Sequence, residues 1–169
     1  MALILAVKEI APSFGEHCWL APNSTIVGDV VLGKNCTVWF NAVLRGDVHE
    51  IRIGDETNIQ DGAIIHCTYQ KAPTYIGSQV SIAHNACVHG CTIHDRVLIG
   101  MGAIVMDGAV VHSDSVIAAG AIVLAGTVVE SGSIYAGIPA KKVKEITPEM
   151  REVIARTAKN YPMYASWYE

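Results

Sequence analysis

Aliphatic residues recur at every sixth position through most of the chain. The series runs from Leu20 to Val129, with one shorter step and two longer ones. An amphipathic helix would repeat about every 3.6 residues and a hairpin strand about every two, so neither matches this pattern. Six-residue repeats are typical of solenoids in which each coil covers the next and buries one continuous core. The pattern therefore predicts an all-β fold, a left-handed parallel β-helix, followed by a C-terminal α-helix.

The repeat also predicts how the chain is divided. Three hexads would form one triangular coil, with a short strand on each side and glycine or polar residues at the corners. Two insertions interrupt the register, with three extra residues within 44–53 and five within 65–76. Insertions leave a solenoid at a corner and often carry function. The repeat ends near Ala136, so we expect residues 1–140 to form the β-helix and residues 141–169 to form a helix and tail packed on it.

The C-terminal segment carries the signals of a helix. Thr147 is suited to be the N-cap, Pro148 to stand in the first turn, and Glu149 to lie near the positive end of the helix dipole. Proline lacks the backbone N–H that a helix interior needs. We therefore expect the helix to run to about Asn160 and to end or kink at Pro162.

Composition excludes several classes of protein. The chain has 169 residues, of which 51% are hydrophobic and 17% are charged, and its net charge of −4 argues against a nucleic-acid surface. The apolar stretch 1–7 is far shorter than the roughly 20 residues of a membrane helix, and it does not form an export signal. The five cysteines are odd in number and lack a CxxC pair. We therefore expect a protein of the reducing cytoplasm that does not contact membranes.

Counting coils predicts which polar side chains meet. Arg45, His66 and His89 take the same outward position on one face of three successive coils, so they should stack about 4.8 Å apart. Asp61 and His84 stack in the same way on the adjacent face. His84 therefore points away from the other two histidines within one chain. In a three-fold trimer the two faces meet, and the three imidazoles could converge.

Three imidazoles with one open position form the usual ligand set of catalytic zinc. Such a site lowers the pKa of a bound water to about 7. Arg45 and Asp61 could form an ion pair across the same subunit interface, which would fix the register between subunits. His17, His49, His94 and His112 fall outside these columns, and we interpret them as structural or solvated. Chance stacking of His66 and His89 stays the alternative at this point.

Several short motifs lie along the repeat. They are Arg45-Gly-Asp47, Asn58-Ile-Gln60-Asp61-Gly62, His66, His84-Asn-Ala-Cys-Val-His89, Ile99-Gly-Met-Gly-Ala-Ile-Val-Met-Asp107 and Gly137-Ile-Pro-Ala-Lys141. Together they resemble the motifs of the γ-class carbonic anhydrase family. The resemblance covers nearly the whole chain, and hexapeptide acyltransferases share the repeat without the spaced histidines.

The resemblance implies an activity and a set of site residues. Members of the family are homotrimers that hydrate CO2 to bicarbonate, with zinc, or in some cases iron or cobalt, between subunits. The implied metal ligands are His66 and His89 of one subunit and His84 of its neighbour. Arg45 and Asp61 match the ion pair between subunits. The residues implied to surround the metal-bound water are Asp47 and Gln60.

The chain departs from well-characterised members of that family at the proton shuttle. Those members carry glutamates after the first histidine ligand and after the Arg-x-Asp motif. Here the first position falls in a loop without a carboxylate, and Val48 stands at the second. His49 or Tyr69 could replace the shuttle. Tyr161 resembles a tyrosine that reaches the site in related short proteins, and packing in the core is the alternative for it.

Two other functions stay open from the sequence. An acyltransferase using acyl-coenzyme A would need a histidine base, for which His94 and His112 are candidates. A non-catalytic trimeric assembly protein would retain the metal only to hold its subunits together. Metal content, CO2 hydration and acetyl-coenzyme A turnover would separate the three.

Overall fold

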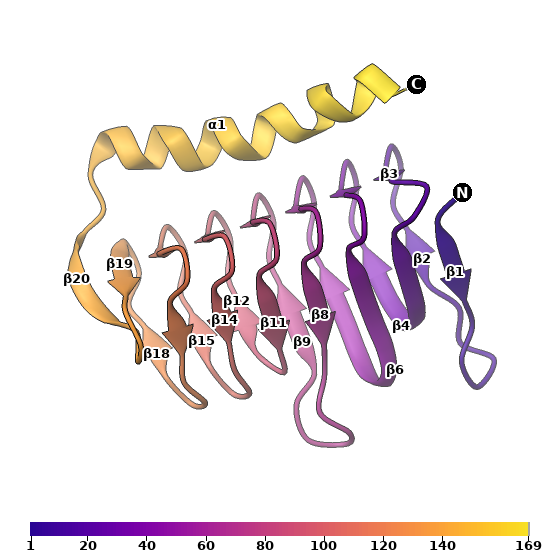
Figure 1. The fold of residues 1–169 in the computed structure, drawn as a ribbon, viewed down its shortest axis with the longest axis horizontal. Coiled ribbons are helices and arrows are strands. Elements are labelled where there is room, and N and C mark those ends of the chain that lie inside the picture. The colour runs from indigo at the N-terminus through magenta and orange to yellow at the C-terminus, as the bar shows by residue number, and fades with distance from the viewer. Residues whose placement is uncertain (169) are drawn as a thin grey trace.

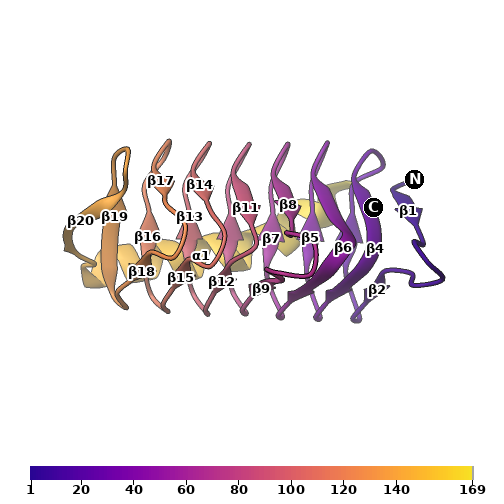
Figure 2. The ribbon, with the colours of Figure 1, turned by 90° about the horizontal axis from the view of Figure 1, so that it is seen from below.

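The computed structural model describes residues 1–168 and shows a β-solenoid with one C-terminal helix lying along it (Figure 1). The parallel β-helix predicted from the hexapeptide repeat is therefore confirmed. Two faces belong to a 12-stranded sheet and the third to an 8-stranded sheet, and the coils stack along one axis (Figure 2). Parallel pairing between equivalent strands of consecutive coils holds nearly the whole solenoid together.

The 12-stranded sheet contains both long strands of the molecule. Strands β4 and β6 each continue from one face to the next, so they join the two faces into one sheet. Its strands are β1 (Leu3–Leu5), β2 (Ser13–Phe14), β4 (Thr25–Leu32), β6 (Val43–Ile53), β8 (Ile64–His66), β9 (Thr74–Ile76), β11 (Cys87–His89), β12 (Thr92–Ile93), β14 (Ile104–Val105), β15 (Val110–Val111), β17 (Ile122–Val123) and β18 (Val128–Val129).

The 8-stranded sheet forms the third face, beneath the helix. Its last strand, β20, turns back antiparallel to β19 and leads into the helix. The strands are β3 (Trp19–Leu20), β5 (Thr37–Val38), β7 (Asn58–Ile59), β10 (Ser81–Ile82), β13 (Leu98–Ile99), β16 (Val116–Ile117), β19 (Ser133–Ala136) and β20 (Lys141–Glu145).

The core is built from the repeating aliphatic positions. Val38, Ile59, Ile82, Ile99 and Ile117 are paired in register along the third face, and each is fully buried. Every coil thus covers the aliphatic side chain of the one before it, which stabilises the solenoid by removing apolar surface from water. This rigid stack fixes the spacing of the outward side chains.

The two insertions have different structures. The extra residues within 44–53 stay inside β6, which bends around the corner as a continuous strand. Gly46 is needed there, because a Cβ at that position would lie 2.6 Å from the carbonyl oxygen of Asp29. The residues 67–73 leave as a loop that protrudes between β8 and β9 (Figure 1).

Helix α1 (Pro148–Ala165) begins as predicted but ends later. Thr147 is the N-cap, and its side chain accepts a hydrogen bond from the backbone N–H of Met150 (3.3 Å). The sequence predicts a helix that runs to about Asn160 and ends or kinks at Pro162. An end at this point is wrong, since α1 continues through Pro162 and is followed by a 3-10 helix, η1 (Ser166–Tyr168). Aromatic side chains beyond the proline pack on the solenoid, and this tertiary packing outweighs the lost backbone hydrogen bond. Within residues 1–168, no helix is long and apolar enough to cross a membrane.

Candidate metal site

His66 and His89 stand side by side on consecutive coils. Strands β8 and β11 pair in parallel with these two residues opposite each other. Their ring centroids are 5.0 Å apart, and Nδ1 of His66 lies 3.1 Å from Nε2 of His89. Arg45 precedes them in the column, with Nη2 3.5 Å from Nδ1 of His66. The structure thus brings together the three residues that the coil register predicts to stack.

Asp47 links Arg45 to His66. Arg45 Nη1 donates to one carboxylate oxygen of Asp47 (2.6 Å), and Nε2 of His66 lies 3.2 Å from the other. Partial burial acts to raise the pKa of Asp47, but hydrogen bonds from Arg45 and His66 outweigh it and bring the pKa below its ordinary value. Burial lowers the pKa of His66, which favours a neutral imidazole. A neutral ring is the form that binds metals.

Asp107 plays the corresponding part for His89. Its Oδ1 lies 2.5 Å from Nδ1 of His89, and its Oδ2 accepts a hydrogen bond from the hydroxyl of Thr68. Partial burial acts to raise the pKa of Asp107, but the hydrogen bonds from Thr68 and His89 bring it below the ordinary value. Asp107 therefore stays ionised and can only accept hydrogen bonds.

A second cluster forms on the adjacent face, around His84. Nδ1 of His84 lies 2.8 Å from Oδ2 of Asp61, whose other oxygen accepts from the backbone N–H of Phe40 (3.2 Å). Gln60 is almost fully buried, and its amide donates to Asn58 (3.0 Å). These residues come from the ends of β7 and β10, which pair in register.

The C-terminal residues cover this second cluster. A cavity of about 220 Å³ lies between the solenoid and the end of α1, lined by Trp39, Asp61, His84, Tyr161, Tyr164, Trp167 and Tyr168. The ring of Tyr161 packs edge-on against Trp39 at 5.3 Å. Burial, with Asp61 nearby, raises the pKa of Tyr161 to about 12, so its hydroxyl stays protonated near neutral pH. Tyr161 both packs on the solenoid and faces the surroundings of His84.

The two clusters do not meet within one chain. Among residues 1–168, no three histidine, cysteine, aspartate or glutamate side chains are arranged to hold a metal ion. The partner of Arg45 in the chain is Asp47, and that of Asp61 is His84. The predicted ion pair between Arg45 and Asp61 involves two subunits and stays a prediction.

Comparison with known proteins identifies a repeat family and relatives that match most of the chain. The model of the bacterial transferase hexapeptide family (six repeats) matches residues 12–46 and 90–125. The chain is 39% identical over 167 residues to the carbonic anhydrase of Geobacillus kaustophilus, covering 99% of this chain and 91% of that protein. It is 51% identical over 142 residues to the "Probable carbonic anhydrase" of Methanocaldococcus jannaschii, covering 84% and 89%. The chain belongs to the gamma carbonic anhydrase family.

The similarity extends to the fold. The crystal structure of a hexapeptide transferase family protein from Anaplasma phagocytophilum superposes with a TM-score of 0.94 at 38% identity, covering 99% of this chain and 98% of that one. Longer members of the gamma carbonic anhydrase family exist. The chain spans 59% of the length of gamma carbonic anhydrase 2, mitochondrial, of Arabidopsis thaliana, to which it is 38% identical over 163 residues.

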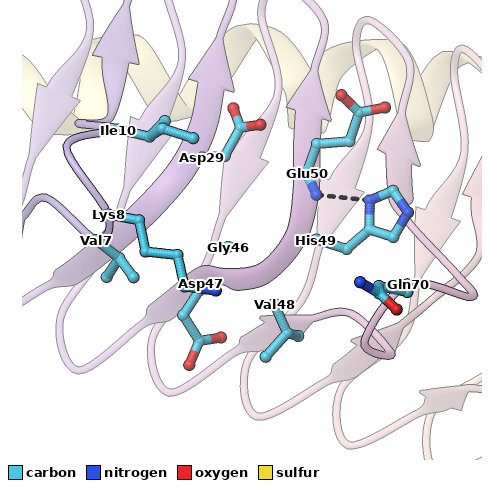
Figure 3. A pocket seen from close by; sticks show the side chains of 10 residues that line it. All are labelled: Val7, Lys8, Ile10, Asp29, Gly46, Asp47, Val48, His49, Glu50 and Gln70. Carbon is cyan, nitrogen blue, oxygen red and sulfur yellow. Dashed lines mark hydrogen bonds between the residues drawn. The ribbon is translucent and has the colours of Figure 1, made fainter.

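A larger cavity lies beside the Arg45–Asp47 segment of this gamma carbonic anhydrase family member. It measures about 430 Å³ and is lined by Val7, Lys8, Ile10, Asp29, Gly46, Asp47, Val48, His49, Glu50 and Gln70 (Figure 3). Nδ1 of His49 accepts a hydrogen bond from the backbone N–H of Glu50 (2.8 Å). The side chains of His49 and Asp47 point away from each other in this view (Figure 3). Tyr69 is exposed on the neighbouring loop.

The sequence motifs include Asp107 but give it no role at the site, and they do not include Thr68. Asp107 follows the aliphatic position Val105 by two residues, on the coil after His89. The repeat therefore predicts the position of Asp107 in the stack of coils. It does not predict the contact with His89, because aspartate is common at solenoid corners and the contact depends on the side-chain rotamer. Thr68 belongs to the inserted loop, whose path the repeat does not define.

Proposed function

We propose that this protein is a metal-dependent carbonic anhydrase that hydrates CO2 to bicarbonate, with its metal bound between subunits of a homotrimer. The observation that carries the proposal is the division of three histidines into two clusters. His66 and His89 lie together on one face, and His84 lies on the adjacent face with its own carboxylate partner. Each cluster is incomplete by itself, and contact between the two faces of neighbouring subunits would complete both.

An apolar surface supports the assembly of subunits. Ile64, Ile104, Met106 and Leu124 are exposed on β8, β14 and β17 and at their ends, and we call them the apolar face. Met106 and Leu124 continue the column of His66 and His89 on the following two coils. Contiguous apolar surface of this kind marks interaction sites. The proposed subunit contact and the histidine pair would thus share one surface.

The residues present fit a divalent metal. The 3.1 Å between Nδ1 of His66 and Nε2 of His89 is close to the separation of two nitrogens bound to one tetrahedral zinc, about 3.3 Å. We propose zinc as the cofactor, with iron or cobalt as ions that the same imidazole donors accept. When bound, such an ion lowers the pKa of a coordinated water toward neutrality. His66, His89 and the neighbour's His84 would be its protein ligands.

The remaining residues would orient these ligands and the substrate. Asp47, held by Arg45, would fix the ring of His66. Arg45 and Asp61 would pair across the interface. Gln60, which Asn58 holds in one orientation, would position the reacting water by a hydrogen bond.

Three further residues are proposed near the proton path. Tyr161, which stays protonated, would act as a hydrogen-bond donor rather than as a base. His49 and Tyr69 are the candidates for the proton shuttle, since the inserted loop of this chain has no carboxylate.

The deciding experiment mixes two inactive variants. Homotrimers of His66→Ala and of His84→Ala should each lack metal while keeping the solenoid, because both side chains project from it. A mixed trimer regains one complete site, where a His84→Ala subunit supplies His66 and His89 and a His66→Ala subunit supplies His84. Metal content and CO2 hydration of separately tagged, mixed trimers should therefore recover in part.

Other outcomes would refute the proposal. His112→Ala is the matched control, since His112 stacks on His94 on another face, and it should retain its metal. Mixed trimers without metal, or metal retained by the His84→Ala homotrimer, would exclude a site shared between subunits. Metal-free wild-type protein that turns over acetyl-coenzyme A would instead indicate an acyltransferase. Trimers that bind metal but do not hydrate CO2 would indicate an assembly protein.

The cysteines bear on location. All five are free thiols. We propose a cytoplasmic protein, because free thiols persist in a reducing compartment.

A further inference from the structure

A chain of hydrogen bonds connects the inserted loop to His89. The Thr68 hydroxyl donates to Oδ2 of Asp107, and Oδ1 of the same carboxylate lies 2.5 Å from Nδ1 of His89. The three residues come from three places in the sequence, namely the 67–73 loop, β11 and the segment after β14. The carboxylate is therefore held from both sides.

The loop itself is fixed close to the histidines. The backbones of Thr68 and Ala72 pair with each other (3.0 Å). At the end of the loop, the Thr74 hydroxyl donates to the carbonyl of His66 (2.6 Å) and accepts from the N–H of Gly90 (2.9 Å). Thr74 thus joins the loop to the backbone next to both histidines. Thr68 is consequently part of a closed structure and not of a free tip.

The contact with Asp107 decides which nitrogen of His89 carries the proton. An ionised carboxylate can only accept, so the proton of a neutral His89 ring must lie on Nδ1. The lone pair is then on Nε2, the nitrogen that faces His66 at 3.1 Å. Carboxylates that accept from the far nitrogen of a metal-binding histidine orient the ring and strengthen the ligand.

We propose that Asp107 and Thr68 are positioning residues that hold His89 in the Nδ1–H form with Nε2 directed toward the metal. The part of this inference that concerns metal binding rests on the proposed function. The part that concerns which nitrogen of His89 carries the proton does not. In this chain the inserted loop would thus serve to anchor the carboxylate that orients a ligand. Asp107 would act through His89 and would not touch the substrate.

The test combines a metal titration with a measurement on metal-free protein. Asp107→Asn should weaken cobalt binding by about 10- to 100-fold, the usual effect of losing such a partner. Thr68→Val, which removes one hydrogen bond to the carboxylate, should weaken it less. Asp95→Asn, at another corner of the solenoid, is the matched control and should leave cobalt affinity unchanged. Circular dichroism and thermal unfolding verify that each variant is folded.

Imidazole ¹⁵N shifts of metal-free protein provide the second readout, at a pH where the ring is neutral. Wild-type His89 should be in the Nδ1–H form, and Asp107→Asn should shift it toward a mixture with the Nε2–H form. A purely packing role for Asp107 would not change the tautomer. An Nε2–H form in the wild type, or unchanged cobalt affinity and tautomer in Asp107→Asn, would overturn the inference. If the wild type binds no cobalt but shows the predicted tautomer change, the proposed function fails and the hydrogen-bonded role of Asp107 stands.

Discussion

His66 and His89 are direct neighbours across β8 and β11, although they are 23 positions apart in the chain. Their spacing follows from the hydrogen bonds between parallel strands and not from any tether between the side chains. A solenoid in this way converts a sequence offset of one coil into a fixed lateral distance. A pair of ligands built on such a ladder is preorganised, because little side-chain freedom is lost when an ion binds.

The aliphatic ladder should dominate stability, and β18 offers a matched pair to measure this. Val129 is fully buried, whereas its neighbour Val128 is 56% exposed. Val129→Ala should lower the free energy of unfolding by about 2 kcal/mol, from lost burial and the cavity left behind. Val128→Ala should change it by less than about 0.5 kcal/mol. Urea denaturation of both variants measures the difference, and equal losses would contradict the inward–outward alternation.

The apolar face should be the subunit contact. Ile104→Glu places a charge on this face, where burial in a trimer would be costly. We expect the variant to be a folded monomer that binds no metal, as measured by sedimentation velocity and elemental analysis. Val128→Glu, on a different face, should remain a trimer with its metal. An Ile104→Glu protein that is still trimeric would place the interface elsewhere.

Cys18 should be the most reactive of the cysteines. Hydrogen bonding with the Cys36 thiol lowers the pKa of Cys18 to about 7, and Cys18 is half-buried. The pKa of Cys36 is raised by the same contact and by burial, and burial raises the pKa of Cys87. Since the thiolate is the nucleophile, the rate of alkylation by iodoacetamide should rise with pH and reach half its maximum near pH 7.

Mass spectrometry of peptides from the alkylated protein identifies the labelled residue. Cys18→Ser should abolish the fast phase, whereas Cys87→Ser should preserve it. Faster labelling of Cys87 than of Cys18 in the wild type would show that the thiol pair does not activate Cys18.

The ion pairs of Asp114 should give a pH-dependent contribution to stability. A hydrogen bond from Arg96 lowers the pKa of Asp114 below its ordinary value of 3.8, and Arg151 of α1 lies 3.4 Å away. The ionised form is thus favoured by folding, so the stabilisation is present above about pH 4 and is lost as the pH falls through the lowered pKa.

Asp114→Asn should therefore lower the melting temperature at pH 7. The decrease should correspond to a loss of about 0.5–1 kcal/mol in the free energy of unfolding, as is usual for a partly exposed ion pair. The difference from wild type should shrink as the pH is lowered from 4 toward 3. Differential scanning calorimetry of both proteins between pH 4 and pH 3 measures this difference in melting temperature. A difference that does not vary with pH would assign the effect to packing instead of charge.

The sequence was sufficient to predict the repeating parts of the molecule. Inward aliphatic residues at every sixth position determine the coil, and the coil determines that His66 lies beside His89. The partner of His89 was not predictable in the same way. The contact of Asp107 depends on a side-chain rotamer and on the path of the 67–73 loop, neither of which follows from periodicity.

The end of α1 shows a second limit. A local rule places the helix end near Pro162, because the ring removes a hydrogen bond. The ring of Tyr168, however, packs at 5.5 Å from Trp19, and that of Tyr161 packs against Trp39, both on distant coils. These contacts depend on where the solenoid places Trp19 and Trp39. The local sequence of the helix therefore does not predict them.

The return of α1 along the solenoid constrains how many coils the protein can have. The helix starts beside β19 and ends beside β3 (Figure 1). Its 18 residues span about 27 Å, and the six strand steps from β19 to β3 span about 29 Å. Duplicating one coil between β10 and β19 would move Trp39 and His84 by one strand spacing. They would then be out of line with the aromatic residues at the C-terminal end of α1. A longer relative that kept this contact would need about three additional helical residues for each added coil.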